Sequence, residues 1–124
     1  MAITKVSTVV LAATAGAAAS TKAAPGATGA WINVTGVYGG DLGYSITNGA
    51  AAPGVPMTLL FQTSPDNGTT IFDYFPVAGD IVASSVTTGT IWLDQGVMYV
   101  RAIAYGNTVN AVTAAANLQA ITAV

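Results

Sequence analysis

Apolar and polar side chains alternate in short runs along this chain, and the clearest example lies between Val55 and Val77. Every second position in its first half is apolar: Met57, Leu59 and Phe61. This alternation is typical of a strand with one buried face. A turn sequence follows, in which Pro65 fixes φ and Gly68 tolerates a positive φ. Because residues 69–75 are mainly β-branched or aromatic, they suit a second strand, and the pattern predicts a β-hairpin around which the other strands pack.

The same alternation recurs along the rest of the chain, between turn sequences rich in Gly, Asn and Asp. Further strands are predicted over residues 30–38, 44–47, 81–86, 90–93, 97–104 and 109–122. Residues 87–89, Thr-Thr-Gly, are interpreted as a turn. Short strands between turns at roughly every 8–12 residues are typical of a β-sandwich or barrel. The sequence predicts an all-β fold: one β-sandwich of jelly-roll or immunoglobulin/fibronectin-III-like type, with about eight or nine strands and an extended N-terminal arm.

The beginning of the chain is interpreted as a strand and arm, residues 1–29, ahead of a β-sandwich domain, residues 30–124. Lys5 before an apolar run also has the outline of a secretory signal. Ser7 and Thr8 interrupt the apolar centre of that run, so we favour a strand over residues 4–12. We expect this strand to pair with a neighbouring subunit or to cover an edge of its own sheet, because an exposed edge invites association.

Composition excludes several kinds of chemistry. The length of 124 residues suits one domain, and the chain contains no His, Cys or Glu. Disulfides, metal sites built from thiolates or imidazoles, and nucleophilic triads with a His base are therefore excluded. The net charge of -2 gives no electrostatic footprint for nucleic acid. No run approaches the roughly 20 apolar residues of a membrane-spanning helix, so we expect no membrane partner.

Charge is scarce in this chain. Charged residues make up 6% of it, against about 25% in a typical soluble domain. A surface built from Thr, Ser, Asn, Gly and Ala suits a protein that packs against copies of itself or a larger body. The alternative is an extracellular β domain with a polar, uncharged coat.

The acidic residues offer little for catalysis. Four of them lie in or beside turn sequences or polar loops, where a carboxylate bonds nearby backbone N–H groups: Asp41, Asp66, Asp80 and Asp94. Asp66-Asn67-Gly68 lacks the alternating ligands and distal Glu of a calcium loop, and a glycosidase needs two facing carboxylates. We therefore predict no enzyme activity, no catalytic or metal-binding residue and no cofactor. Trp31 and Trp92 are interpreted as core residues, with a binding-site role as the alternative.

The predicted strand at residues 97–104 has two unlike faces. One face is wholly apolar and is expected to line the core: Met98, Val100, Ala102 and Ala104. The other combines aromatic, aliphatic and guanidinium groups, as interface cores do, so we expect a partner subunit or a crossing segment of the same chain to cover it. There Arg101 is expected to pair with Asp73, for which a solvated edge position is the alternative. The interface candidates are Ile3, Val6, Val9, Leu11, Tyr99, Arg101, Ile103, Tyr105 and Asp73.

Two stretches resemble a known group of proteins. Ile46-Thr47-Asn48-Gly49 followed by Ala52-Pro53, and then the strand that ends Ser64-Pro65-Asp66-Asn67-Gly68-Thr69-Thr70, resemble small structural proteins of tailed bacteriophages. There an "I-T-N-G … A-P" stretch leads into "S-x-D-G-x-T-W", and Ile71 stands here in place of the Trp. The segment GVMYVRAIAYGNT, residues 96–108, is similar to the penultimate strand and turn of fibronectin-III or immunoglobulin-like domains.

The resemblance implies a virion protein without catalysis, of the capsid decoration (cement) type. It would be assembled in the bacterial cytoplasm and bind the major capsid protein or another virion protein on the capsid surface. We expect a homo-oligomer, with a trimer favoured. The alternatives are a phage tail or baseplate accessory, or a carbohydrate- or receptor-binding module that uses Trp31, Tyr38 and Tyr44 as a stacking platform. A glycan-cleaving enzyme is the third class.

Overall fold

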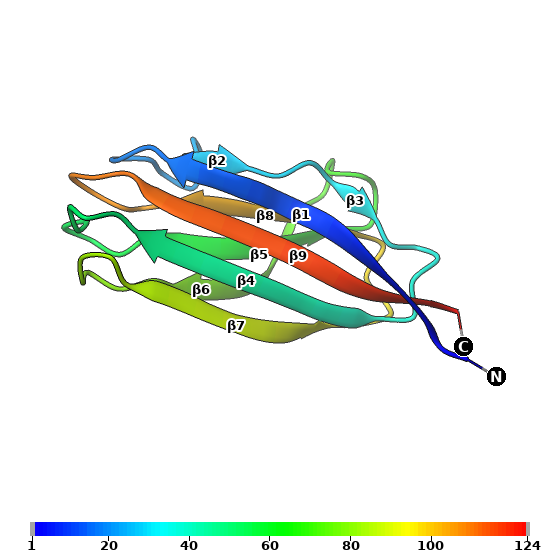
Figure 1. Ribbon diagram of the computed structural model, residues 1–124. Helices are drawn as coiled ribbons and strands as arrows, with labels where there is room; N and C mark the ends of the chain where they lie inside the picture. Colours follow the sequence, from blue (N-terminus) through cyan, green and yellow to red (C-terminus); the bar gives the residue numbers. More distant parts are fainter. Residues whose placement is uncertain (1, 124) are drawn as a thin grey trace.

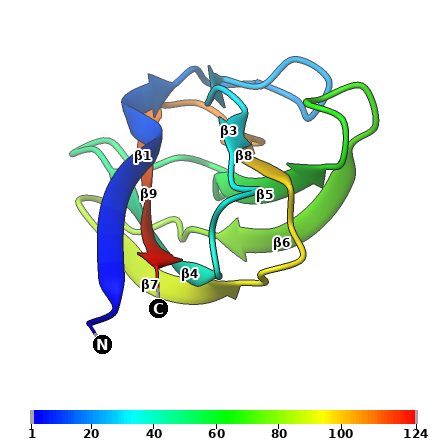
Figure 2. The same ribbon diagram turned by 90° about the vertical axis from the view of Figure 1, so that its right-hand side faces the viewer.

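The computed structural model describes residues 2–123 and places nine strands, with no helix among these residues, in two antiparallel sheets. The strands are β1 (Thr4–Gly16), β2 (Ala27–Thr28), β3 (Ile32–Asn33), β4 (Gly40–Asn48), β5 (Thr58–Ser64), β6 (Phe72–Ala78), β7 (Val86–Leu93), β8 (Tyr99–Tyr105) and β9 (Val112–Ala123). The first sheet has the order β1-β9-β4-β7, and the second has the order β2-β8-β5-β6, with β3 also paired to β8. Figure 1 looks onto the first sheet, and Figure 2 shows the same strands from the side where both termini lie. The predicted all-β fold is confirmed, and the two facing sheets are compatible with a β-sandwich.

The strands pair in a nested order around one hairpin. β5 pairs with β6, β4 with β7, β2 and β3 with β8, and β1 with β9, so each pair encloses the one before it. The chain is thus one long antiparallel ribbon with the β5–β6 hairpin at its tip, which confirms the hairpin predicted from the sequence. Additional pairing of β9 with β4, and of β8 with β5, folds this ribbon into two sheets.

The core lies between the inner faces of the sheets. Its largest fully buried side chains include Leu42, Ile46, Met57, Leu59, Phe61, Leu93 and Leu118. Tyr44 packs against Phe61 with ring centroids 6.4 Å apart and an interplanar angle of 57°. The Tyr44 ring also lies over Gly89, where a Cβ atom would collide with it. Gly89 lies inside strand β7, so the predicted turn at residues 87–89 is wrong. The glycine at this position leaves room for the Tyr44 ring.

Several predicted strand boundaries also change. Only residues 32–33 of the predicted strand at 30–38 are in a strand, β3, whereas β4 extends well beyond the predicted residues 44–47. Met98 is 44% exposed and does not line the core, because β8 begins only at Tyr99. These errors lie where Gly, Thr and Asn are frequent, since such residues occur both in turns and on flat sheet surfaces.

The predicted N-terminal strand exists and covers an edge of its own sheet. β1 pairs with β9 from Thr4 to Gly16, somewhat beyond the predicted residues 4–12. A register shift between Val9 and Leu11 changes which side chains face inward. Val9 is 60% exposed, whereas Val10 and Leu11 are 2% and 4% exposed and belong to the core. The inner part of β1 is therefore packed within the sandwich.

The burial of β1 makes a direct prediction. Leu11→Ala should lower the free energy of unfolding of the isolated chain by about 2–5 kcal/mol, because it leaves a cavity in the core. Val9→Ala, two residues away on the exposed side of the shift, should change it by less than about 0.5 kcal/mol. Urea unfolding followed by circular dichroism measures both. Equal, small effects would mean that β1 detaches from β9 in solution.

Candidate functional site

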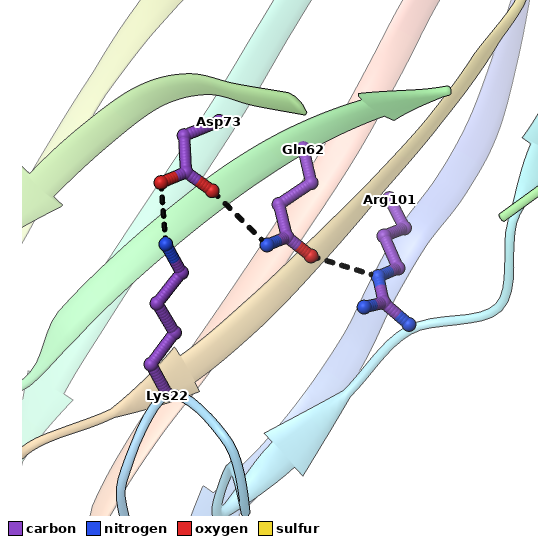
Figure 3. Close-up of polar contacts among 4 residues, drawn as sticks. All are labelled: Lys22, Gln62, Asp73 and Arg101. Atoms are coloured by element: carbon purple, nitrogen blue, oxygen red, sulfur yellow. Dashed lines mark hydrogen bonds and ion pairs between the residues drawn. The ribbon is translucent and has the colours of Figure 1, made fainter. Parts of the chain in front are cut away.

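A polar network lies on the outer face of the second sheet, away from the core (Figure 3). Lys22, in the loop between β1 and β2, donates from Nζ to Oδ2 of Asp73 on β6. Gln62 on β5 donates from Nε2 to the other oxygen, Oδ1, of Asp73 at 3.2 Å. Arg101 on β8 donates from Nε to Oε1 of Gln62 at 3.0 Å. Since Gln62 is the cross-strand partner of both Asp73 and Arg101, the register of β6, β5 and β8 brings these three residues together.

The predicted direct pair between Arg101 and Asp73 is wrong. β5 lies between β6 and β8, so the two charged side chains are one strand too far apart, and Gln62 links them. Asp73 pairs instead with Lys22, which is 51 residues away in the sequence and forms the only ion pair among residues 2–123. No local pattern around Lys22 distinguishes it, because its partner is set by where the β1–β2 loop folds.

The outer face of β8 and β5 is largely buried, and Lys22 of the β1–β2 loop crosses it. Ile103 and Leu60 are 1% and 3% exposed, and Gln62 is 4% exposed. In Figure 3 the side chain of Lys22 extends across β8 and β5 toward Asp73. A crossing segment of the same chain, one of the two predicted covers for this face, is therefore present in the β1–β2 loop, and cover by a partner subunit stays a prediction. β5 is buried on both faces, and the expectation that it is only half-buried is wrong.

The charges of the network influence one another. The hydrogen bond from Lys22, with a further one from Gln62, holds the pKa of Asp73 below its usual value. The same bond to Asp73 raises the pKa of Lys22. Burial lowers the pKa of Arg101. Both ends of the Gln62 amide face a charged group, so its orientation is fixed.

Trp31 completes the network at its far end. The guanidinium carbon Cζ of Arg101 lies 4.6 Å from the centroid of the Trp31 ring, a cation–π contact. The other neighbour of the indole is Gly68 in the β5–β6 turn, where φ is +100° and a Cβ atom would collide with the ring. Trp31 thus joins the hairpin turn to β8. Trp31 and Tyr44, two members of the stacking platform named as an alternative, do not lie side by side, because Tyr44 packs against the core beside Phe61 while Trp31 contacts Arg101 on the outer face.

The interface candidates named from the sequence do not form one surface. Those on or beside β1 that are exposed lie at the edge of the first sheet: Ile3, Val6 and Val9. Leu11 and Ile103 are buried in the chain itself. Tyr99, Arg101 and Tyr105 are half-buried on the second sheet, and Asp73 is exposed there beside them.

A different exposed surface lies on the loops at the end of the sandwich away from the termini (Figure 1). Hydrogen bonds join these loops: Gly54 N–H donates to Thr108 O at 3.0 Å, and Ser84 N–H donates to Gly49 O at 2.9 Å. Four aliphatic side chains project from them, with exposures between 50% and 76%, and we name them the loop-end patch: Val55, Ile81, Val82 and Val109. The sequence did not indicate this patch, since its members belong to three separate segments.

The loop-end patch has a rigid support. Asn107 is fully buried and donates from Nδ2 to Gly16 O at 3.1 Å and to Asn110 O at 2.9 Å. Val109, two residues after Asn107, has a φ of +73°, a backbone conformation that is strained for a β-branched residue. Its side chain is 76% exposed. The predicted strand start at Val109 is therefore wrong, because the chain enters β9 only at Val112. A strained, exposed aliphatic residue on a fixed loop is typical of a contact surface.

Two shallow grooves also lie on the surface of the protein. One of about 380 Å³ lies between the hairpin turn and the β7–β8 turn, and its lining includes Phe72, Tyr74, Asp94 and Met98. Another of about 510 Å³ lies on the outer face of the first sheet, over small side chains such as Ala12, Ala13, Gly43 and Ala115. Neither is lined by a charged residue other than Asp94.

Three of the Asp residues have the turn role that the sequence indicates. Asp66 accepts from the N–H and the hydroxyl of Thr70, and these bonds lower its pKa. Asp80 accepts from Val82 N–H and Ser85 Oγ, which lowers its pKa too. Asp94 accepts from Gly96 N–H at 2.8 Å. Within residues 2–123 no three acidic groups gather as metal ligands, and no helix there is suited to cross a membrane.

No model of a protein family matches the chain, and no curated protein matches it. The resemblance to structural proteins of tailed bacteriophages therefore depends on the motifs at residues 46–53 and 60–70 alone.

The central position of Gln62 leads to one prediction. Gln62→Met keeps the length of the side chain but removes the acceptor for Arg101 and one donor to Asp73. It should lower the free energy of unfolding by about 1–3 kcal/mol, since the half-buried Arg101 loses the acceptor of its Nε–H. Gln119→Met, at an exposed position of β9, should cost less than about 0.5 kcal/mol. Equal values from urea unfolding would show that the network adds no stability.

The lowered pKa of Asp73 makes a second prediction. A carboxylate whose pKa is lower in the folded state stabilises the fold above its unfolded pKa of about 4, and this contribution is lost as pH falls through the folded pKa. Asp73→Asn should therefore lower the melting temperature at neutral pH and reduce its decrease below about pH 4. Asp66 and Asp80 should preserve the rest of that decrease. Thermal unfolding at a series of pH values measures the melting temperatures of the wild type and of Asp73→Asn. If the two melting temperatures fall in parallel below about pH 4, the prediction is contradicted.

Proposed function

We propose that this chain is a structural protein of a bacteriophage particle, a decoration or cement protein that binds the outside of the capsid without catalysing a reaction. The observation that carries the proposal is the nature of its surface. Among residues 2–123, fourteen large apolar side chains are exposed, whereas the whole chain has three basic and five acidic residues. Such a surface suits a protein that is covered by partners for most of its life.

The nested pairing supports a jelly-roll as the type of sandwich. A jelly-roll is an antiparallel ribbon folded over into two four-stranded sheets, and with β2 and β3 counted as one interrupted strand this chain has that order. An immunoglobulin-like sandwich joins its strands in a different order. Jelly-rolls are common in viral capsid proteins, and this fold supports a role in the virion by analogy.

The loop-end patch is the surface we assign to the capsid. Its four aliphatic side chains lie on loops fixed by hydrogen bonds, so binding needs little ordering of the backbone. The nearest acidic residue in these loops, Asp80, already accepts bonds from Val82 and Ser85 and adds little repulsion. The partner is then the major capsid protein, presenting an apolar, uncharged area. Each copy that binds only the assembled shell stabilises it by mass action.

The proposal predicts that the tagged chain, expressed in the bacterium that produces the phage, bands with capsids on a density gradient. Val109→Asp should reduce this association by about tenfold or more, because it places a charge in the buried contact. Val9→Asp, on the exposed face of β1, tests the other candidate surface, and Gln119→Asp serves as a control with a new charge elsewhere. Circular dichroism of each variant verifies folding.

The outcomes separate the candidate functions. Banding with capsids that lack tails, together with heat resistance greater than that of undecorated capsids, supports the decoration proposal. Banding only with tails would assign the chain to the tail or baseplate. Absence from all particles would contradict a role in the virion. Loss on Val9→Asp but not on Val109→Asp would move the contact from the loop-end patch to β1.

A further inference from the structure

The free edges of the two sheets differ in how they are protected. β2 and β3 have two residues each, and β6 contains Pro76 and the charged Asp73. β1 contains Lys5 and three register shifts against β9. Short strands, prolines, charges and bulges are the devices that prevent an edge from pairing with another chain. Three of the edges therefore carry such a device.

β7 is the edge without protection. Its eight residues, Val86–Leu93, include no charge and no proline, and its register with β4 runs without a shift from Thr47–Val86 to Gly40–Leu93. No strand of residues 2–123 pairs with it on the other side. A long, regular, uncharged edge is a template for one more strand.

The hydrogen bonds around β7 show which backbone groups face outward. Ser85 O accepts from Asn48 N–H, so the odd-numbered residues of this strand direct their backbone groups toward β4. Backbone groups alternate along a strand, and the even-numbered residues therefore face away from the sheet. Trp92 agrees with this, because its C=O accepts from the hydroxyl of Tyr74 on β6 at 2.9 Å. The N–H and C=O groups of Val86, Thr88 and Thr90 remain directed outward.

We propose that β7 pairs antiparallel with β7 of a second copy, about a two-fold axis at Thr88. In this register Thr88 faces Thr88 of the second copy, and Val86 faces its Thr90, so every outward N–H and C=O of the three residues gains a partner. The facing side chains are β-branched and exposed, which suits cross-strand packing, and no charges meet. The two first sheets become one continuous sheet.

The features of β7 favour a second copy over a different protein. Selection of a foreign strand requires charges or pockets that recognise its side chains, and the exposed positions of this strand offer Val, Thr and Trp without either. A segment that matches itself in antiparallel register needs no further recognition. The inference depends only on this edge and not on the proposed role in the virion, and its test uses the purified chain alone.

The test is the mass of the purified chain in solution, by light scattering during size exclusion. We expect a dimer of twice the chain mass of 12.3 kDa. Thr88→Pro removes an outward N–H without taking a bond from β4, and Thr88→Lys places two cations at the axis. Each should raise the dimer dissociation constant by about tenfold or more. Gln119→Lys, exposed on the same face of β9, should leave it unchanged.

Single cysteines test the register, because the chain has none of its own. Thr88→Cys should form a disulfide-linked dimer on mild oxidation, since facing residues in this register are about 5.5 Å apart at Cα. Thr90→Cys should do so only when mixed with Val86→Cys. A monomer at every concentration, a trimer, or a dimer that both folded Thr88 variants leave intact would overturn the proposal. Cross-linking of Thr90→Cys alone, without Thr88→Cys, would overturn the register.

Discussion

Nested antiparallel pairing of the strands determines both the core and the polar surface of this protein. The β5–β6 hairpin closes locally, but each later pair joins segments farther apart in the sequence, up to Thr4 with Ala123. The core exists only when the folded ribbon brings β9 beside β4 and β8 beside β5, because no single pair buries its apolar face alone. Folding that depends on such distant contacts is expected to be slow, since loop closure precedes the gain from burial.

The same pairing order determines the polar network. Because β5 lies between β6 and β8, a neutral Gln62 occupies the position between Asp73 and Arg101 and bonds to both. The amide lets a carboxylate and a guanidinium share one sheet face without direct contact, and it leaves the carboxylate available to Lys22. The β1–β2 loop is thereby held over a face that the strands alone would leave open.

The scarcity of charge gives the surface its character. Several of the few charged groups bond to other groups of the same chain: Asp73 and Lys22 in the network, and Asp66 and Asp80 in turns. The loops and the β7 edge are left with aliphatic and hydroxyl side chains. The loop-end patch and the β7 edge are different parts of the surface, so a contact with a larger body and a contact between copies are compatible in one protein.

The class of fold, the central hairpin and the role of the turn aspartates could all be predicted from the amino-acid sequence. These features depend on residues near one another in the chain: the alternation of Leu59 and Phe61, and the hydrogen bonds of Asp66 to Thr70. Turn residues and strand periodicity act locally, so a single sequence is enough to recognise them.

Which segments become neighbours could not be predicted from local patterns and depends on the complete fold. Residues 87–89 have the sequence of a turn but lie in strand β7, where Gly89 pairs with Tyr44 of β4 and the Tyr44 ring occupies the space of a side chain. Leu11 became a core residue and Val9 an exposed one through a single register shift. Asp73 pairs with Lys22 rather than with Arg101. Of the four sheet edges, β7 is the one that is regular and uncharged. The physical reason is the same in each case: local alternation fixes that a segment is a strand, whereas its partner and register are fixed by burial across the whole sandwich.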